Sequence, residues 1–266
     1  MAGDPHLIEL PFDPDLTLGP LVLAWHAIFA VLAVFVGTTL AVRLASSRVP
    51  EDRGWQIATW AVVSGFVGAR ALHVFERWEY FVADPARVFA VSDGGLSILG
   101  AVIGGFAAMS AATARLRAPV GFLADVGGSV AGVGMGIGRI GDIVNGEHHA
   151  VACSGGLPWC VRYTHPNTLG QRDYVHPAVA YELVLDFAIA ALLLTLRSRI
   201  VGRVPEGRLL WAFLVLYGAG RFAISFLRLD PLIVDGLRQA QVVALGLVGS
   251  GAVMLAYLRT RARRRA

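Results

Sequence analysis

The 266-residue chain contains no lysine, so all 23 of its basic residues are arginine. This absence excludes a retinal protein, because the retinal Schiff base requires a lysine amine. Charge of either sign is scarce: charged residues make up 16% of the chain and hydrophobic residues 56%, and the mean hydropathy is +0.61. A water-soluble domain could hardly cover its surface with so few charges. The composition therefore predicts an integral membrane protein.

The chain has only two cysteines, Cys153 and Cys160, and both lie in one polar connection. This connection, about residues 146–176, is rich in glycine and proline, which predicts an irregular extracytoplasmic cap. Outside the cytoplasm the two cysteines could form a disulfide that closes a small loop, or they could remain free thiols. A metal site that adds His148 and His149 is the alternative, but the spacing matches no standard zinc pattern, and no metal is expected.

Long hydrophobic runs make up most of the remaining sequence. A bilayer core requires about 20 apolar residues in a helix. About seven stretches meet this length with few charges: residues 20–42, 55–75, 96–114, 119–145, 177–196, 207–227 and 239–258. Since no linker, repeat or low-complexity block interrupts them, we expect a single polytopic membrane domain over residues 1–266. The predicted fold class is an all-α integral membrane protein with about seven transmembrane helices.

The arginines are distributed unevenly among the connections between these stretches. One set of connections, at residues 43–53, 115–117, 197–208 and 259–265, is rich in arginine, whereas the opposite set mixes arginine with as many acids. By the positive-inside rule the first set is cytoplasmic, which predicts an N-out and C-in orientation. We interpret the basic C-terminal tail as an anchor at anionic lipid, and no nucleic-acid partner is expected.

One apolar run ends in a cluster of polar residues, G-R-I-G-D-I-V-N-G-E, at residues 138–147. On a helix, Arg139, Asp142 and Asn145 fall within an arc of about 120° and can face one cavity. An ionisable residue at membrane depth costs at least about 2.5 kcal/mol by insertion scales, so it is a functional candidate unless it is paired. Arg139 and Asp142, three residues apart, could also form a self-contained structural pair.

Four other predicted helices place polar side chains at the depth of this cluster. Arg70 and Arg221 both fall in the outer half of a core about 30 Å thick. His26, Tyr181 and Glu182 fall within the first two turns of their helices. Arginines gathered at one depth are best explained by an anion, and the guanidinium group binds phosphate bidentately. The sequence therefore predicts a site for a phospholipid headgroup.

Glycine patterns within the helices are interpreted as structural. Residues 136–141 match G-x-G-x-x-G, but no strand precedes them and the apolar helix leaves no room for a βαβ unit, so no nucleotide or other cofactor is expected. Small residues recur at four-residue intervals where helices could approach closely: Gly128, Gly132 and Gly136 in one run, and Gly100 with Gly104 in another.

The polar cluster resembles the signature of a bacterial family, the prolipoprotein diacylglyceryl transferases, which reads roughly G-R-x-G-N-F-x-N-G-E. Other segments resemble motifs of the same family in the right order: L-G-P-L-V-L-A-W-H-A-I-F-A-V at 18–31, V-G-A-R-A-L-H-V-F at 67–75, D-G-G-L-S-I-L-G-A-V-I-G-G at 93–105, H-P-A-V-A-Y-E at 176–182 and Y-G-A-G-R-F-A-I-S-F-L-R at 217–228. The resemblance covers most of the chain and agrees with seven spans and an external N-terminus.

The resemblance implies an enzyme of the bacterial cytoplasmic membrane. It would move the diacylglyceryl group of phosphatidylglycerol onto the lipobox cysteine thiol of a lipoprotein precursor, and glycerol phosphate would leave. By this resemblance Arg139 and Arg221 hold the phosphate and neutralise its growing charge, and Arg70 is a further anchor. Asn145 and Glu147 would orient the headgroup. The remaining substrate-binding candidates come from the matched motifs: Gly94, Gly95, Gly146, Tyr181 and Glu182.

Several positions depart from the motifs of the family. The family histidine often assigned as a base or headgroup contact is replaced by leucine, and further changes alter nearby polar groups: Leu99 for histidine, Asp142 for asparagine, Val179 for glutamine, Ser225 for glutamate, and His26 for a common tyrosine. If transfer takes place, the proton acceptor has therefore moved. His26, Asp142 and Glu147 are the candidates.

Three alternatives to the transferase remain open. The same lipid site could serve a different acceptor or headgroup, or the chain could bind phospholipid without catalysis. A seven-helix transporter or receptor is the third alternative, but a transporter is expected to show polar groups at the midplane and on both sides. In this sequence the polar groups gather at the outer ends of the predicted helices.

Overall fold

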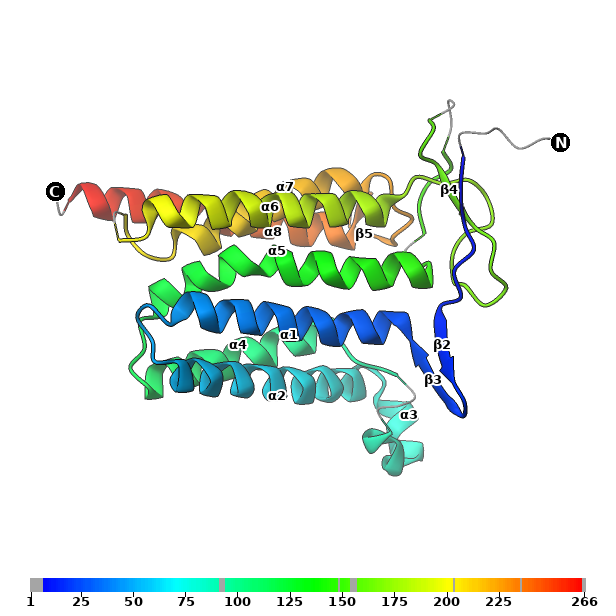
Figure 1. Ribbon diagram of the computed structural model, residues 1–266, viewed down its shortest axis with the longest axis horizontal. Helices are drawn as coiled ribbons and strands as arrows, with labels where there is room; N and C mark the ends of the chain where they lie inside the picture. Colours follow the sequence, from blue (N-terminus) through cyan, green and yellow to red (C-terminus); the bar gives the residue numbers. More distant parts are fainter. Residues whose placement is uncertain are drawn as a thin grey trace. The chain divides into compact units, whose positions relative to one another are not determined.

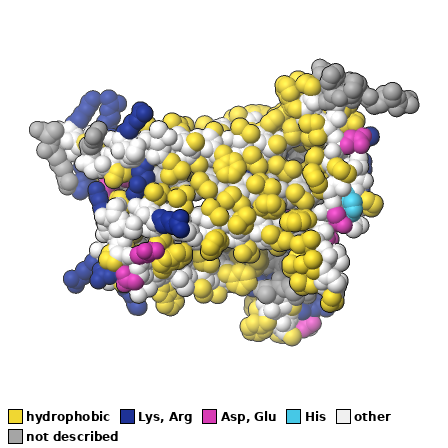
Figure 2. Space-filling model, viewed as in Figure 1, with side chains coloured by type: hydrophobic (Ala, Val, Ile, Leu, Met, Phe, Trp, Pro, Cys, Tyr) yellow, Lys and Arg dark blue, Asp and Glu magenta, His cyan; other side chains and the backbone are white. Residues whose placement is uncertain are grey.

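The computed structural model describes residues 7–90, 94–147, 149–153, 157–202, 204–234 and 236–264. Within these ranges seven helices are long and apolar enough to cross a membrane: α1 (Trp25–Ala45), α2 (Glu51–Glu76), α4 (Ile98–Arg115), α5 (Val120–Asn145), α6 (Ala178–Ile200), α7 (Arg208–Ser225) and α8 (Gln239–Arg263). The predicted number of spans is confirmed. Hydrophobic side chains cover the helix surfaces, whereas charged side chains gather near the helix ends (Figure 2), as expected of a multi-pass membrane protein.

The chain divides into two compact units, which are described separately. Unit 1 contains residues 1–37 and 124–266, and unit 2 contains residues 38–123. The single domain expected from the sequence stays a prediction.

Unit 1 is built on α5, α6, α7 and α8 together with the first turns of α1 (Figure 1). Helix α7 packs against both α6 and α8. Three pairs of short strands lie in its connections: β1 (Ile8–Leu10) runs parallel to β4 (Val161–Tyr163), and β2 (Asp15–Leu18) with β3 (Leu21–Ala24), and β5 (Leu232–Val234) with β6 (Leu237–Arg238), are antiparallel. The cap, expected to be irregular, therefore includes one strand, β4.

The first predicted span begins later than the sequence pattern indicates. Residues 21–24 were expected in the helix, but they form β3 and pair with β2 across a turn at Gly19, whose φ is +61°. The hairpin satisfies the backbone groups of this segment. Trp25 then begins α1, and its N–H donates to the carbonyl of Pro14 at 2.9 Å.

Small residues bring helices together in both units, as the sequence predicts. In unit 1 a Cβ atom on Gly132 would collide with the backbone of Asp186 in α6, and one on Gly128 would come within 2.5 Å of Leu210 in α7. In unit 2, α2 and α4 pack at Gly68 and Gly104, where an added Cβ on Gly104 would lie 3.2 Å from the Cα of Gly68. Such contacts allow close backbone approach within a bilayer.

A buried carboxylate of α5 caps the start of α7. Both oxygens of Asp125, which is 6% exposed, accept backbone N–H groups, from Gly207 at 2.9 Å and from Leu209 at 2.7 Å. The first N–H groups of a helix have no partner within the helix, and an acidic group there also interacts favourably with the helix dipole. Asp125 therefore fixes the register of α7, which carries Arg221, against α5, which carries Arg139.

Replacement of Asp125 by alanine is expected to destabilise unit 1 by about 1.5–3 kcal/mol, because it leaves two buried N–H donors without acceptors. The apparent midpoint of thermal unfolding in detergent measures the loss. A matched control is Asp52→Ala, which removes an exposed carboxylate from the first turn of α2. It should cost no more than about 1 kcal/mol. Equal effects of the two substitutions would contradict the capping role.

Candidate functional site

A buried carboxylate on α6 lies at the centre of the polar groups predicted from the sequence. Glu182 is 1% exposed, and its Oε2 lies 2.9 Å from Nη2 of Arg139 on α5. Its Oε1 accepts a hydrogen bond from Nη1 of Arg221 on α7 and lies 3.3 Å from Nη1 of Arg228. Three guanidinium groups from separate segments thus converge on one side chain. We call Glu182 and these three arginines the arginine cluster.

Arg139 is surrounded by carboxylates from two helices. Its Nη1 donates to Oδ2 of Asp142 at 2.9 Å, and its Nε lies 3.9 Å from Oδ2 of the fully buried Asp186. The pair with Asp142 that the sequence offered as a structural alternative is present. It is not self-contained, because the same guanidinium also reaches Glu182 on α6.

Three members of this network were not among the predicted site residues: Asp186, Arg228 and Asp230. Arg228 is 3% exposed, and its Nε and Nη2 each lie 3.0 Å from an oxygen of Asp230. Asp230 also lies 3.6 Å from Nη2 of Arg221. Arg228 follows Arg221 by seven residues, close to two helical turns, so the spacing alone could have placed both on one face. No comparable spacing identified Asp230, although it and Arg228 both lie beyond the end of α7 at Ser225.

A groove with one polar and one apolar part opens beside Arg221. The cavity has a volume of about 290 Å³ and is lined by residues of α7, α8 and the connection between them: Tyr217, Arg221, Asp230, Pro231, Gln239, Ala240, Val243, Ala244 and Leu247. Its polar groups come from the start of α8 and the end of α7. Its apolar side chains follow α8 away from them, as Val243, Ala244 and Leu247.

His26, at the start of α1, joins the network through Asp142. Its Nδ1 lies 2.9 Å from Oδ1 of Asp142, while the other oxygen of that carboxylate is the one bound by Arg139. The side chain of His26 is 43% exposed. Close approach of the two helices makes this pair possible, since an added Cβ on Gly141 would lie 2.9 Å from the Cα of His26.

A metal ion is the alternative occupant of this corner. Ligand atoms of His26, Asp142 and Glu147 all lie within 4.8 Å of one another, and they are the one such group among the residues that the structure describes. The surroundings do not favour a cation, however. Arg139 already brings a positive charge to 2.9 Å from Asp142, and Nδ2 of Asn145 donates to Oε1 of Glu147 at 2.5 Å. These three side chains are therefore better suited to exchanging a proton than to binding a metal ion.

The cap is tied to the end of α5 at Gly146 and Tyr163. Gly146 has φ +79°, and an added Cβ would collide with Gly170 and lie 2.5 Å from Oγ1 of Thr168, so the packing of two segments of the chain requires glycine here. Substrate binding by Gly146 stays a prediction. The hydroxyl of Tyr163 donates to the carbonyl of Ile143 at 2.9 Å. Burial raises the pKa of Tyr163 to about 12, so it remains a donor at neutral pH.

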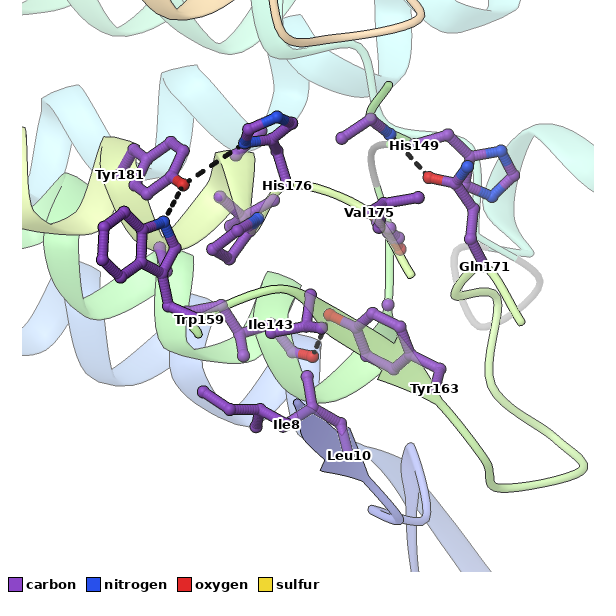
Figure 3. A pocket seen from close by; sticks show the side chains of 18 of the residues that line it. Ile8, Leu10, Ile143, His149, Trp159, Tyr163, Gln171, Val175, His176 and Tyr181 are labelled. Carbon is purple, nitrogen blue, oxygen red and sulfur yellow. Dashed lines mark hydrogen bonds between the residues drawn. The ribbon is translucent and has the colours of Figure 1, made fainter. Parts of the chain in front are cut away.

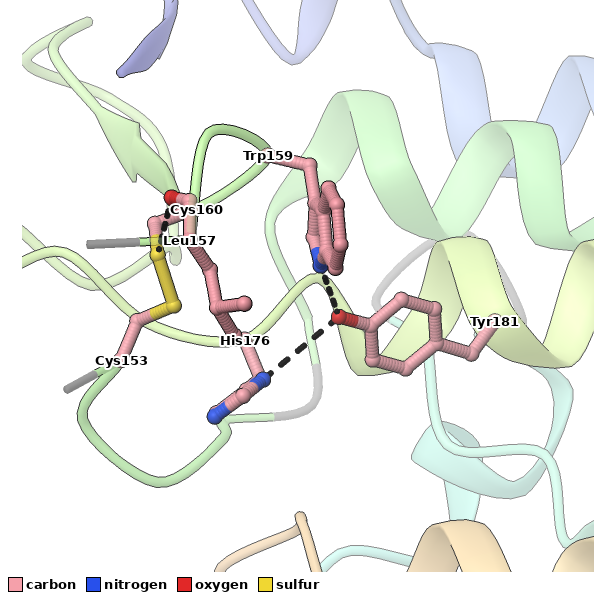
Figure 4. Close-up of a disulfide and its surroundings, with 6 residues drawn as sticks. All are labelled: Cys153, Leu157, Trp159, Cys160, His176 and Tyr181. Atoms are coloured by element: carbon pink, nitrogen blue, oxygen red, sulfur yellow. Dashed lines mark hydrogen bonds between the residues drawn. A yellow bond between two sulfur atoms is a disulfide. The ribbon is translucent and has the colours of Figure 1, made fainter. Parts of the chain in front are cut away.

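A second cavity, of about 410 Å³, lies between the cap, β1 and the start of α6 (Figure 3). Tyr181 points into it, and its hydroxyl accepts from Nε1 of Trp159 at 2.9 Å and lies 3.5 Å from Nδ1 of His176. Cys153 and Cys160, for which the sequence left a disulfide or free thiols open, form a disulfide beside these residues (Figure 4), with Cα atoms 5.9 Å apart. His148, from the alternative metal site, lies outside the described residues.

Arg70 belongs to unit 2, where backbone carbonyls take up its guanidinium group. Its nitrogens donate to the carbonyls of residues 87, 88, 90, 94 and 95 at 2.5–3.2 Å. Gly94 and Gly95 have φ of +81° and +80°, and a Cβ on Gly95 would collide with His73. These contacts indicate a clamp on the connection before α4. Substrate binding by Arg70, Gly94 and Gly95 stays a prediction.

Comparisons with known proteins agree with the resemblance found in the sequence. The family model described as prolipoprotein diacylglyceryl transferase matches residues 15–257. A phosphatidylglycerol–prolipoprotein diacylglyceryl transferase of Trichormus variabilis is 34% identical over 253 residues, which cover 92% of this chain and 89% of the relative. Proteins with the same name from Synechococcus elongatus (95% of this chain, 90% of the relative) and Shouchella clausii (91% and 88%) are each 32% identical. This chain therefore belongs to the prolipoprotein diacylglyceryl transferase family.

Proposed function

We propose that the chain is a multi-pass enzyme of the bacterial cytoplasmic membrane that transfers a diacylglyceryl group from phosphatidylglycerol to the cysteine thiol of a prolipoprotein. The observation that carries the proposal is the convergence of Arg139, Arg221 and Arg228 on Glu182, beside the groove along α8. A lipid has the same division into a charged headgroup and apolar chains as the groove. Membership of the family supports the same activity.

The phosphate of the lipid would bind at Arg221 in exchange for one of the two carboxylates that its guanidinium group contacts, Glu182 and Asp230. Guanidinium groups bind phosphate through paired N–H donors, and their charge is not lost on burial. Arg221 belongs to both the cluster and the groove, so a phosphate at this residue places the acyl chains of the lipid along Val243 and Leu247. The carboxylate of Glu182 holds the guanidinium groups in place before the lipid arrives, which lowers the cost of orienting them.

Transfer replaces a carbon–oxygen bond of the lipid by a carbon–sulfur bond. The phosphate oxygen that leaves gains negative charge as the bond breaks, and Arg139 and Arg221 stabilise this charge more strongly than that of the intact lipid. Asn145 and Glu147, joined by a hydrogen bond at 2.5 Å, would orient the glycerol headgroup. Tyr181, on the cap side of α6, would contact the acceptor peptide.

A lipid-binding protein without transferase activity is the second candidate, and one observation favours it. Leu99, which replaces the histidine expected from the family motif, cannot accept a proton, and its side chain is 60% exposed. Loss of this group alone would leave lipid binding intact and remove catalysis. The two candidates differ in transfer and agree in binding.

Complementation distinguishes the two candidates. We expect this chain to rescue a bacterium depleted of its own transferase, and the purified protein to move labelled diacylglycerol from phosphatidylglycerol to a lipobox peptide. A peptide with serine in place of the cysteine is the matched control and should gain no label. Binding of phosphatidylglycerol without rescue or labelling would support the second candidate and contradict the proposal.

A further inference from the structure

We infer that His26 is the general base that accepts the proton of the acceptor thiol, and that Asp142 is a positioning residue that orients its imidazole ring. The inference rests on the proposed transferase function and identifies a catalytic group for it. Its basis is the contact between Nδ1 of His26 and Oδ1 of Asp142 at 2.9 Å, with Oδ2 of the same carboxylate held by Arg139 at 2.9 Å.

The reaction needs a base because the thiolate of cysteine, and not the thiol, is the nucleophile. A free cysteine thiol has a pKa of about 8.5, so only a few per cent is ionised at neutral pH. Imidazole is the side chain best suited to remove the proton in this range. In the tautomer that carries its proton on Nδ1, which lies 2.9 Å from Oδ1 of Asp142, the ring presents Nε2 as the acceptor. The 43% exposure of the His26 side chain leaves the ring accessible to a substrate.

The other two candidates are already engaged by donors. Asp142 accepts from Arg139 on one oxygen and contacts His26 on the other, so removing the thiol proton would require it to give up one of these partners. Glu147 accepts from Asn145 at 2.5 Å. His26 differs from both: a carboxylate lies against one of its ring nitrogens, and its side chain is partly exposed.

The carboxylate of Asp142 is suited to support a base at His26, because its Oδ1 lies 2.9 Å from Nδ1 of the ring. An asparagine at 142 could accept from the ring, but it could not stabilise the imidazolium ion that forms when the proton is transferred. His26 and Asp142 together therefore form one proton acceptor.

The step balances without any further reactant. The S–H proton moves to Nε2 of His26, and the sulfur attacks the glycerol carbon that carries the phosphate ester. The S–C bond forms as the C–O bond breaks, and the electron pair of that bond leaves with the phosphate oxygen of glycerol phosphate. The imidazolium then returns its proton to this oxygen or to water, and the ring is neutral for the next cycle.

An acceptor that needs no base tests the assignment. Transfer from phosphatidylglycerol is measured with two peptides of the same sequence, one with cysteine and one with selenocysteine, whose selenol is ionised at neutral pH. His26→Gln should lower kcat at least about 100-fold with the cysteine peptide and less than about fivefold with the selenocysteine peptide. The KM for phosphatidylglycerol should stay within about twofold. Asp142→Asn should show the same selectivity with a smaller loss, about 10-fold or more.

The matched control is His165→Gln, which removes the histidine of a partly exposed pair with Asp13 in which Nε2 lies 3.7 Å from the carboxylate. It should change neither rate. His26→Asn is made in parallel, so that at least one variant inserts and folds.

Each other outcome decides against the inference. Full activity of the His26 variants with the cysteine peptide overturns it. An equal loss with both peptides, or a loss carried by the KM for the lipid, means that His26 acts in structure or binding and also overturns it. If the unmodified protein transfers to neither peptide, the proposed function itself fails and the assignment fails with it.

Discussion

Replacement of Arg139 by alanine is expected to reduce diacylglyceryl transfer at least about 1000-fold, the largest loss for any single residue of the arginine cluster. Arg139 links two carboxylates, because it contacts Asp142 in its own helix and Glu182 in α6. Its loss removes a donor to the phosphate, and it also leaves buried carboxylates without their partner. These unpaired carboxylates alone are expected to lower the free energy of unfolding by about 3–5 kcal/mol.

Arg139→Lys separates the effect on chemistry from the effect on folding. Lysine keeps the charge near Asp142 and Glu182, but it cannot offer paired donors to a phosphate. We expect the protein to insert and to keep most of its thermal stability, with transfer reduced about 10- to 100-fold. Labelled transfer, binding of phosphatidylglycerol and the apparent unfolding midpoint are measured together. Arg208→Lys, at the opposite end of α7 from Arg221, is the control and should keep full activity. Full activity of Arg139→Lys would remove Arg139 from the phosphate site.

Much of the fold could be predicted from the sequence because a membrane restricts the possible structures. The lengths of the apolar stretches correspond to the seven observed helices, and the glycines at four-residue intervals lie at close helix contacts. The start of α1 was wrong because apolar content does not distinguish a buried helix from the hairpin at 15–24. Pairing of β1 with β4, more than 140 residues apart, has no local signal in the sequence.

The site was partly predictable for a similar reason. Ionisable side chains at one depth of the membrane must find partners, so Arg139, Arg221 and Glu182 could be placed together before their contacts were known. The depth of a residue in the membrane does not show which neighbouring helix its side chain faces. Tyr181 and Glu182 illustrate this limit: they are adjacent in α6, yet one points to the cap cavity and the other to the arginine cluster.

Tertiary contacts determine the remaining features. Asp230 joins the network only because the chain turns back after α7, and Asp125 caps α7 across a large sequence separation. Arg70 has the same residue type and expected depth as Arg221, but its donors are bound by carbonyls of a nearby connection. An arginine in an apolar stretch therefore predicts a buried anion or carbonyl partner. It does not by itself show whether that partner is a substrate or the backbone of the protein.

Glu182→Gln is expected to destabilise unit 1 about as strongly as the loss of Arg139 does. Glutamine has nearly the same shape as glutamate, but it lacks the negative charge. Glu182 is only 1% exposed, and its charge is shared by three guanidinium groups. Removal of one partner from a buried ion pair costs about 3–5 kcal/mol, because the remaining charges stay buried and unpaired. The matched control is Glu9→Gln, which removes the partner of Arg162 in an exposed pair and should cost less than about 1 kcal/mol.

The effect of Glu182→Gln on activity shows what the carboxylate contributes. If Glu182 orients the arginines, transfer should fall at least about 100-fold at saturating phosphatidylglycerol, since misplaced donors lose their preference for the transition state. Its removal also leaves Arg139 and Arg221 with fewer negative partners, which offsets the lost preorganisation, so the affinity for phosphatidylglycerol should change much less than kcat. Weaker lipid binding with an unchanged kcat would contradict the orienting role. A normal unfolding midpoint would contradict the buried position from which both expectations follow.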